Sequence, residues 1–189
     1  MSSLREAVGD AAVALVCTSS TGPEDSCLEL LSATAPETTV LWVTYSRSPS
    51  VCLDHFRAAG ASGSLSVIAV GESPTDIPDS EDVTVKSVST PEDLTALGIT
   101  LSQALSTHDD AVVCFDSLTV LLQYVDTERA YEFLNALTGQ LYAADAEAHF
   151  HLDPAAHDTR TVDALASLFD AIVEDTNGTW SARHREILR

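Results

Sequence analysis

The polar loop that follows the first apolar run of the chain has the position of a phosphate-binding loop, but it lacks the residues that bind phosphate. A working loop of this kind ends in Gly-Lys-Ser/Thr, whose lysine and backbone N–H groups hold phosphates. Here Glu24 and Asp25 stand where the glycine and lysine belong, and Gly22 and Ser26 keep the pattern. Two carboxylates in a first helical turn complement the helix dipole and repel a triphosphate. Whether the loop is a degenerate phosphate site or an ordinary acidic turn, the sequence argues against ATPase activity.

A second candidate is Asp116, which closes the apolar run at 111–115. In P-loop ATPases, an acid at the end of such a strand supports magnesium. Many buried strands end in Asp, however, and Asp116 or Ser117 could instead cap the next helix, which is the interpretation we favour. Gly22, Ser26 and Asp116 therefore form a vestigial cofactor site, and we assign no catalytic residue. Weak nucleotide binding without turnover, through Ser26 and Asp116, remains an alternative.

Histidines and acids near the end of another apolar run form the best metal candidate. Strand alternation would place His149, His151 and Asp153 on one face, with His157 just beyond. Two histidines and a carboxylate can hold zinc or iron with an open position. These residues could equally line a cleft, cap a helix or form hydrogen bonds in the core. A metal-dependent enzyme or sensor is thus an alternative function, with a divalent metal as its cofactor.

The four cysteines show no C-x-x-C spacing. Two fall in predicted buried strands and two in predicted helices: Cys17, Cys27, Cys52 and Cys114. Buried cysteines without metal-ligand spacing behave as small apolar residues. We therefore expect free buried thiols and no disulfide.

The charge balance is strongly acidic. The 189 residues carry 29 acids against 9 lysines and arginines, for a formal net charge of −20, and Lys86 is the single lysine. This composition is typical of a salt-loving archaeon, in which carboxylates hold water and cations at high salt. Clustered basic residues occur only near the C-terminus, so nucleic acid is not an expected partner.

The chain has the size and composition of one globular domain. Hydrophobic residues make up 45% of the sequence, which is enough to bury a sizeable core. No signal peptide and no apolar run of about 20 residues is visible, so we expect a cytoplasmic protein without a membrane span. We expect a single domain over residues 1–189, with a final strand or a short tail at 178–189.

Apolar runs alternate with amphipathic segments along the whole chain. We expect strands at 11–18, 40–45, 65–70, 83–88, 111–115 and 148–152, with 83–88 at an edge. Thr90 and Thr127 are candidate helix caps, and apolar residues from Val162 to Ile172 predict a last helix. Alternating strands and helices predict an α/β fold, a three-layer sandwich around a mostly parallel sheet. Any ligand should bind at the carboxyl ends of the strands.

The segment from Leu118 to Val125, continued by Tyr131, Phe133 and Tyr142, is more apolar and aromatic than one helix stripe needs. Core packing explains much of this composition. A subunit interface is the alternative, because Tyr and Phe are enriched there. A homo-oligomer is therefore compatible with the sequence.

The order of these elements resembles the KaiC/RecA-like P-loop ATPases. More closely, it is similar to a haloarchaeal family of KaiC-like proteins of uncharacterised function with a degenerate P-loop. The resemblance covers nearly the whole chain and rests on VLWVTYSRSP (40–49), DLTALGI (93–99), VCFDSLT (113–119), LLQYVD (121–126) and HFHLDPAAHD (149–158).

The resemblance implies a phosphate loop at 19–26, a magnesium-supporting Asp116 and a catalytic glutamate after the second strand. The chain departs at two of these places, since Asp25 replaces the lysine and Ser46-Arg47 stands where acids are expected. We therefore expect a non-catalytic RecA/KaiC-like domain, a pseudo-ATPase with no required cofactor. It would act as a regulatory or adaptor protein through contacts with a protein partner that the sequence does not identify.

Overall fold

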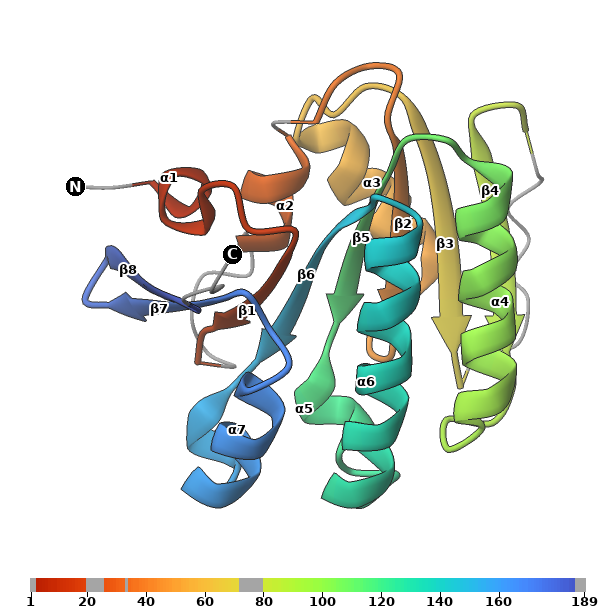
Figure 1. The fold of residues 1–189 in the computed structure, drawn as a ribbon. Coiled ribbons are helices and arrows are strands. Elements are labelled where there is room, and N and C mark those ends of the chain that lie inside the picture. The colour runs from red at the N-terminus through yellow and green to blue at the C-terminus, as the bar shows by residue number, and fades with distance from the viewer. Residues whose placement is uncertain (1–2, 20–25, 33, 72–79, 186–189) are drawn as a thin grey trace.

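The computed structural model describes residues 3–19, 26–32, 34–71 and 80–185 as an α/β sandwich (Figure 1). Its centre is an eight-stranded sheet in the order β4-β3-β2-β5-β6-β1-β7-β8. All neighbouring strands are parallel except the last pair, β7 and β8. The strands are β1 (Val13–Cys17), β2 (Thr39–Thr44), β3 (Ser64–Val70), β4 (Val83–Val88), β5 (Ala111–Asp116), β6 (Glu147–Leu152), β7 (Ala171–Thr176) and β8 (Thr179–His184).

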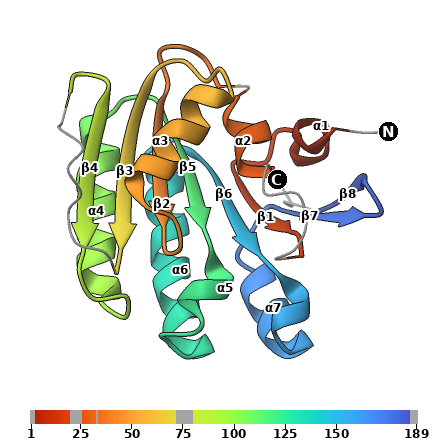
Figure 2. The ribbon, with the colours of Figure 1, turned by 180° about the vertical axis from the view of Figure 1, so that it is seen from behind.

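Helices cover both faces of this sheet, which confirms the predicted three-layer class (Figures 1 and 2). One layer holds α1 (Leu4–Val8), α2 (Ser26–Leu31) and α3 (Pro49–Ala58). The other holds α4 (Leu94–Thr107), α5 (Leu118–Leu121), α6 (Thr127–Ala143) and α7 (Thr159–Ala166), with the short 3-10 helix η1 (Pro154–Ala156) before α7. All six predicted strands are present, and β4 lies at an edge as expected.

The sheet separates two apolar layers of the core. On the side of α4 to α7, Phe150 stacks on Phe115 with ring centroids 5.3 Å apart and packs at a tilt against Phe169 with ring centroids 5.2 Å apart. On the side of α2 and α3, Trp42 and Phe56 pack around smaller apolar side chains. Because β1 and β2 are buried at every position, the central strands are continuous apolar runs and not alternating ones.

The C-terminal region differs from the prediction of one helix that extends from Val162 to Ile172. Helix α7 ends at Ala166, and Ile172 belongs to β7. Residues 179–184 form β8, which pairs antiparallel with β7, so this segment is the strand and not the tail of the two alternatives that the sequence left open. Asn177 and Gly178 have φ angles of 55° and 78° and make the two-residue turn between the strands. Such positive φ angles are what a tight hairpin requires.

The caps of the two longest helices also differ from the prediction. Asp93 caps α4, since its carboxylate accepts from the Ala96 N–H at 2.9 Å. Asp126 caps α6 in the same way, accepting from the Arg129 N–H at 2.9 Å. Aspartates therefore satisfy the first backbone donors of these helices, and Thr90 and Thr127 do not have that role.

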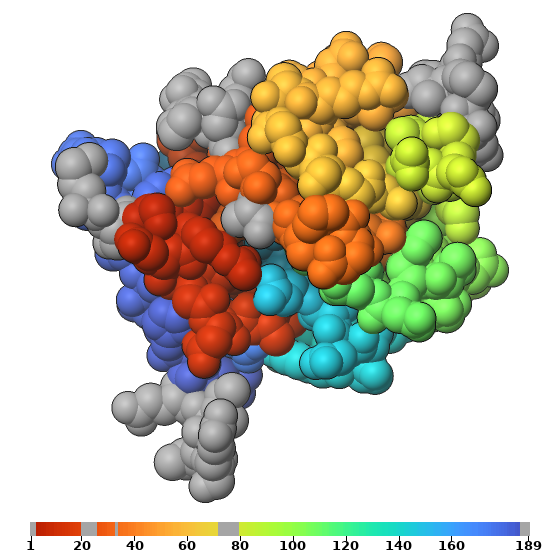
Figure 3. All heavy atoms as spheres, turned by 90° about the horizontal axis from the view of Figure 1, so that it is seen from above, coloured from red at the N-terminus to blue at the C-terminus, as the bar shows by residue number. Residues whose placement is uncertain are grey.

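The two ends of the described chain lie together. Helix α1 packs against both β7 and β8, and the view from above shows the N-terminal segment beside the C-terminal hairpin (Figure 3). None of the helices formed by the described residues combines the length and apolar composition needed to cross a bilayer.

Candidate functional site

A cavity of about 220 Å³ opens at the carboxyl edge of the parallel strands, where ligands of such folds bind. Loops after β1, β2, β5 and β6 surround it, and its lining includes Ser26, Arg47, Asp116 and His151. Ser26 and Asp116 of the predicted vestigial site thus face one cavity. Gly22 lies outside the described residues.

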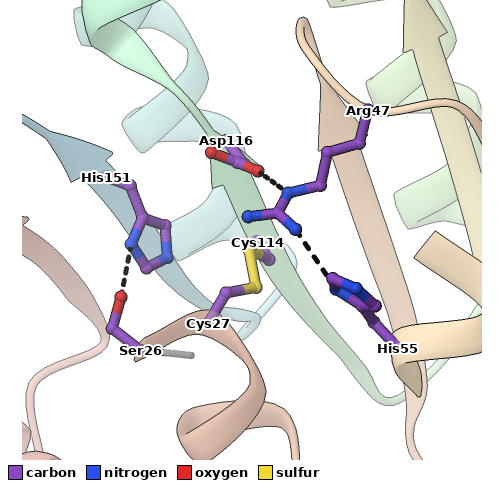
Figure 4. Close-up of a disulfide and its surroundings, with 7 residues drawn as sticks. All are labelled: Ser26, Cys27, Arg47, His55, Cys114, Asp116 and His151. Carbon is purple, nitrogen blue, oxygen red and sulfur yellow. Dashed lines mark hydrogen bonds and ion pairs between the residues drawn. A yellow bond between two sulfur atoms is a disulfide. The ribbon is translucent and has the colours of Figure 1, made fainter. Parts of the chain in front are cut away.

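Asp116 is held by an arginine. Arg47 Nε donates to a carboxylate oxygen of Asp116 at 3.1 Å, and the two side chains are only 22% and 18% exposed (Figure 4). Arg47 Nη1 also lies 3.1 Å from His55 Nδ1, and the Arg47 N–H donates to Thr44 Oγ1 at 2.9 Å. Arg47 comes from the loop after β2, the place where the resemblance implies a catalytic glutamate. The carboxylate that would support magnesium is therefore neutralised within the chain.

The next residue caps α5. Ser117 Oγ accepts from the Val120 N–H at 3.3 Å, so Ser117 is the cap and Asp116 is not. The sequence left the capping role open between Asp116 and Ser117, and the structure assigns it to Ser117, while the Asp116 carboxylate forms an ion pair. Its partner is Arg47.

Four buried side chains converge on the sheet face that α2 covers. Cys114 of β5 and His149 of β6 are register partners, and His151 lies two residues further along the same face of β6. Cys27 reaches them from α2. One ligand atom from each of the four residues lies within 4.8 Å of all the others. Phe115 and Phe150 point to the opposite face, as strand alternation requires.

The two cysteines of this cluster form a disulfide, which corrects the expectation of free thiols (Figure 4). Cys17 and Cys52 are free and buried, as expected. The prediction failed for Cys27 and Cys114 because it considered spacing along the chain. Strand and helix packing joins residues 87 positions apart.

Burial controls the protonation of both histidines. Burial lowers the pKa of His151 to about 4, against a weaker upward pull from Asp116. Burial, followed by the neighbouring His151 and Arg5, lowers the pKa of His149 well below its usual value. Both imidazoles are therefore neutral near pH 7, the state in which a ring nitrogen can bind a metal.

The other two predicted metal ligands lie apart from this cluster. Asp153 caps η1, accepting from the Ala155 N–H at 2.9 Å, and His157 ends the same short helix. The cluster of four ligand atoms contains neither residue. Strand β6 ends at Leu152, so the alternation that aligns His149 with His151 does not continue to Asp153.

A family model described as "Family of unknown function (DUF7504)" matches residues 11–175. The chain belongs to this family. The match includes every element from β1 to β6 and therefore the whole candidate site of the DUF7504 domain. No curated protein matches the chain.

Solved structures match the DUF7504 domain at low sequence identity. A Pyrococcus horikoshii OT3 protein, solved as structural-study project PH0250, superposes with a TM-score of 0.63 at 12% identity, covering 94% of this chain and 88% of that one. The flagellar accessory protein FlaH of Methanocaldococcus jannaschii superposes with a TM-score of 0.60 at 13% identity, covering 95% and 80%. At this identity the likeness establishes a shared RecA-like fold, and it carries no residue role across.

The sequence did not indicate Cys27 and Cys114 as candidate metal ligands beside the two histidines. Alternation in the run at 111–115 does place Cys114 opposite Phe115, and Cys27 lies in the first turn of its helix. What the sequence lacks is the pairing of β5 with β6, which brings Cys114 beside His149. Without knowledge of that strand order, the sequence does not indicate that two cysteines and two histidines lie together.

Proposed function

We propose that this chain is a non-catalytic domain of RecA-like fold that acts as a regulatory or adaptor protein through protein contacts. The observation that carries the proposal is the Arg47–Asp116 ion pair inside the carboxyl-edge cavity. A nucleotide with magnesium needs that carboxylate for the metal and a lysine for the phosphates. In this chain Arg47 binds the carboxylate of Asp116, and Asp25 stands at the position of the lysine.

Ser26 supports the same conclusion. In a phosphate-binding loop, the hydroxyl at this position binds magnesium. Here the Ser26 side chain is buried, and its Oγ lies 3.3 Å from His151 Nδ1. Both polar groups that survive from the ATPase pattern within the described residues thus have partners inside the protein.

Calorimetric titration of the full chain with ATP and magnesium at high salt tests this proposal. We expect neither measurable heat of binding nor phosphate release. The variant Arg47→Ala is the matched control, because it frees Asp116 without supplying a lysine, and it should bind no better. Micromolar binding by the wild-type chain would overturn the proposal. Binding without hydrolysis would favour the alternative of a nucleotide sensor.

The distribution of basic residues argues against nucleic acid as the partner. Among the described residues, three arginines are already paired with acids: Arg5 with Glu147, Arg47 with Asp116 and Arg183 with Glu174. Phosphate contacts require clustered unpaired cations. A filter-binding assay with duplex and single-stranded DNA should show no retention.

Support for protein contacts comes from the outer layer of α4 and α6. A groove between them is lined by Ile99, which is 55% exposed, by less exposed apolar side chains such as Phe133, and by polar side chains. An exposed apolar side chain beside such a groove can form part of a contact surface. Sedimentation at high salt and native copurification measure such contacts, including self-association. A chain that stays monomeric and copurifies with no stoichiometric protein would contradict an adaptor role.

A further inference from the structure

The cluster beneath α2 contains two unsatisfied nitrogens in addition to the disulfide. His149 and His151 are 5% and 7% exposed, and Nε2 of each has no hydrogen-bond partner within residues 3–19, 26–32, 34–71 and 80–185. Buried polar side-chain atoms nearly always have a partner, so an orphaned pair on one face requires an explanation. The disulfide does not supply one, because it engages the two sulfurs and neither imidazole.

Ser26 fixes how one of these rings is presented. Its Oγ lies 3.3 Å from His151 Nδ1 (Figure 4), which leaves Nε2 of the same ring available. A hydrogen bond at one ring nitrogen that orients the other is the arrangement found behind metal-binding histidines. The His149 and His151 rings lie edge to face with centroids 5.2 Å apart, so their nitrogens can approach one ion.

We propose that the reduced chain binds one Zn²⁺ ion through Cys27 Sγ, Cys114 Sγ and one imidazole nitrogen each from His149 and His151. Two sulfur and two nitrogen ligands are typical of a tetrahedral zinc site. Bonds of about 2.0–2.3 Å place tetrahedral ligands roughly 3.3–3.8 Å apart. The observed cluster, within 4.8 Å, needs a small contraction at its longest separations and parting of the two sulfurs.

The charge of the filled site suits its buried position. Two thiolates and Zn²⁺ sum to zero, and the imidazoles are neutral, so no net charge is placed in the apolar layer. The orphaned nitrogens gain a partner at the same time. A thiolate pair also favours zinc over magnesium or calcium, which prefer oxygen ligands.

Zinc loading on reduction and zinc release on oxidation can each be written with electrons and protons in balance. A dithiol or phosphine reductant supplies two electrons, and two protons are taken up as the Cys27–Cys114 bond becomes two thiols. Zinc then displaces both thiol protons. A peroxide or a disulfide reagent would take two electrons from the thiolates, restore the S–S bond and release the ion. The site therefore exchanges a disulfide for a metal bridge that joins α2 to β5 and β6.

Four protein ligands leave no open position for water or substrate. Sites closed in this way are structural, whereas catalytic zinc sites keep a fourth position vacant. The ligand set therefore replaces the sequence-based set, in which Asp153 and His157 stood beside the two histidines. The function inferred for the metal changes as well: it is a redox-sensitive structural site and not the centre of a metal-dependent enzyme.

Metal content of the full wild-type chain tests the inference first. Protein reduced with a phosphine in high-salt buffer is incubated with Zn²⁺, desalted and analysed by plasma mass spectrometry. We expect one zinc per chain, with loss of that zinc after treatment with hydrogen peroxide. Loading with Co²⁺ should give the intense visible bands of tetrahedral coordination and a sulfur-to-cobalt charge-transfer band. Absence of stoichiometric metal from reduced protein, or a weak octahedral spectrum, would overturn the inference.

Variants then identify the ligands. Cys27→Ser and Cys114→Ser should each abolish stoichiometric zinc and the cobalt charge-transfer band. Cys52→Ser is the matched control, since it removes another buried cysteine of the same layer, and it should retain both. Asp153→Asn and His157→Asn should also retain zinc. Loss of metal in these last variants, with retention in Cys27→Ser, would refute the proposed set. If the cysteine variants fail to fold by circular dichroism, the wild-type cobalt spectrum decides, because only thiolate ligands produce the charge-transfer band.

This inference is independent of the proposed function. Nucleotide titration reports on Arg47 and Asp116, whereas zinc content reports on Cys27 and Cys114. Either result can fail while the other holds.

Discussion

Arg47 changes what Asp116 can do. A carboxylate at the end of a parallel strand can bind a ligand, but here a guanidinium from the neighbouring loop binds it and also contacts His55. Arginine suits this position because its planar group can serve two acceptors at once. One residue thus converts a potential metal ligand into part of the protein's own structure.

The Arg47–Asp116 pair should contribute measurably to stability. It is half-way between a surface pair and a buried one, so we expect a coupling energy of about 1–2 kcal/mol. Urea unfolding of Arg47→Ala, Asp116→Ala and the double variant gives this energy as a double-mutant cycle. Arg183 and Glu174, which are more exposed, provide a matched pair that should couple by less than about 1 kcal/mol. Equal coupling in the two cycles would contradict a structural role for Asp116.

The two free cysteines should be chemically silent in the folded protein. Burial raises the pKa of both Cys17 and Cys52 to about 12. At pH about 8, a thiol with this pKa is ionised in only about one molecule in 10⁴, and the thiolate is the reactive form. Iodoacetamide labelling followed by mass spectrometry should therefore modify neither cysteine in native protein and both in denaturant. Labelling of native Cys17 or Cys52 at the denatured rate would show that the core is open.

At the scale of the element, aspartates control where the long helices begin. Asp126 accepts from the Arg129 N–H and so caps α6, the longest helix. Asp126→Ala should lower the free energy of unfolding by about 1 kcal/mol, because it leaves a backbone donor without its partner. Asp126→Asn keeps an accepting oxygen and should cost much less. A thermal or urea melt of the two variants measures the difference, and equal losses would mean that the charge of Asp126 matters and its hydrogen bond does not.

Helices and strands that have a strong local pattern of apolar residues could be predicted from the sequence. Those whose limits depend on strand pairing could not. Five apolar runs became the largely buried strands β1, β2, β3, β5 and β6. The run at 83–88 became the edge strand β4, in which only Val88 is buried. The region 162–172 misled the prediction, since Leu168 and Phe169 are buried in a turn and Ile172 belongs to β7. Helical spacing describes buried residues there, but it does not show where the chain reverses.

The candidate site was predictable to the same extent. His149 and His151 were found because strand alternation is local. Their two cysteine neighbours depend on the order β5-β6-β1 and on α2 lying across it, which no spacing in the sequence encodes. Asp116 was found by its position at the end of a strand, whereas its pairing with Arg47 depends on the path of the loop after β2.

At the scale of the whole molecule, the surface charge exceeds what internal pairing can neutralise. With 29 acids against 9 lysines and arginines, the formal net charge is −20, and one-to-one pairing with these bases leaves 20 carboxylates over. These charges repel one another more in the compact state than in the unfolded chain. Burial of the apolar layers therefore has to outweigh the long-range repulsion between carboxylates, and the strength of this repulsion depends on the salt concentration.

Added salt should consequently stabilise the protein. The screening length falls from about 10 Å at about 0.1 M salt to about 3 Å at about 1 M, so most of the repulsion is removed within this range. Thermal melts in a KCl series should show a midpoint that rises steeply up to about 1 M and then flattens. Exclusion of salt from the protein surface would instead give a rise that continues without a plateau. A melt at about pH 4 provides the control: partial protonation of the carboxylates reduces the repulsion, so the same salt series should have a smaller effect there. A midpoint that does not change with KCl at neutral pH would show that the carboxylates are spaced widely enough for water alone to screen them.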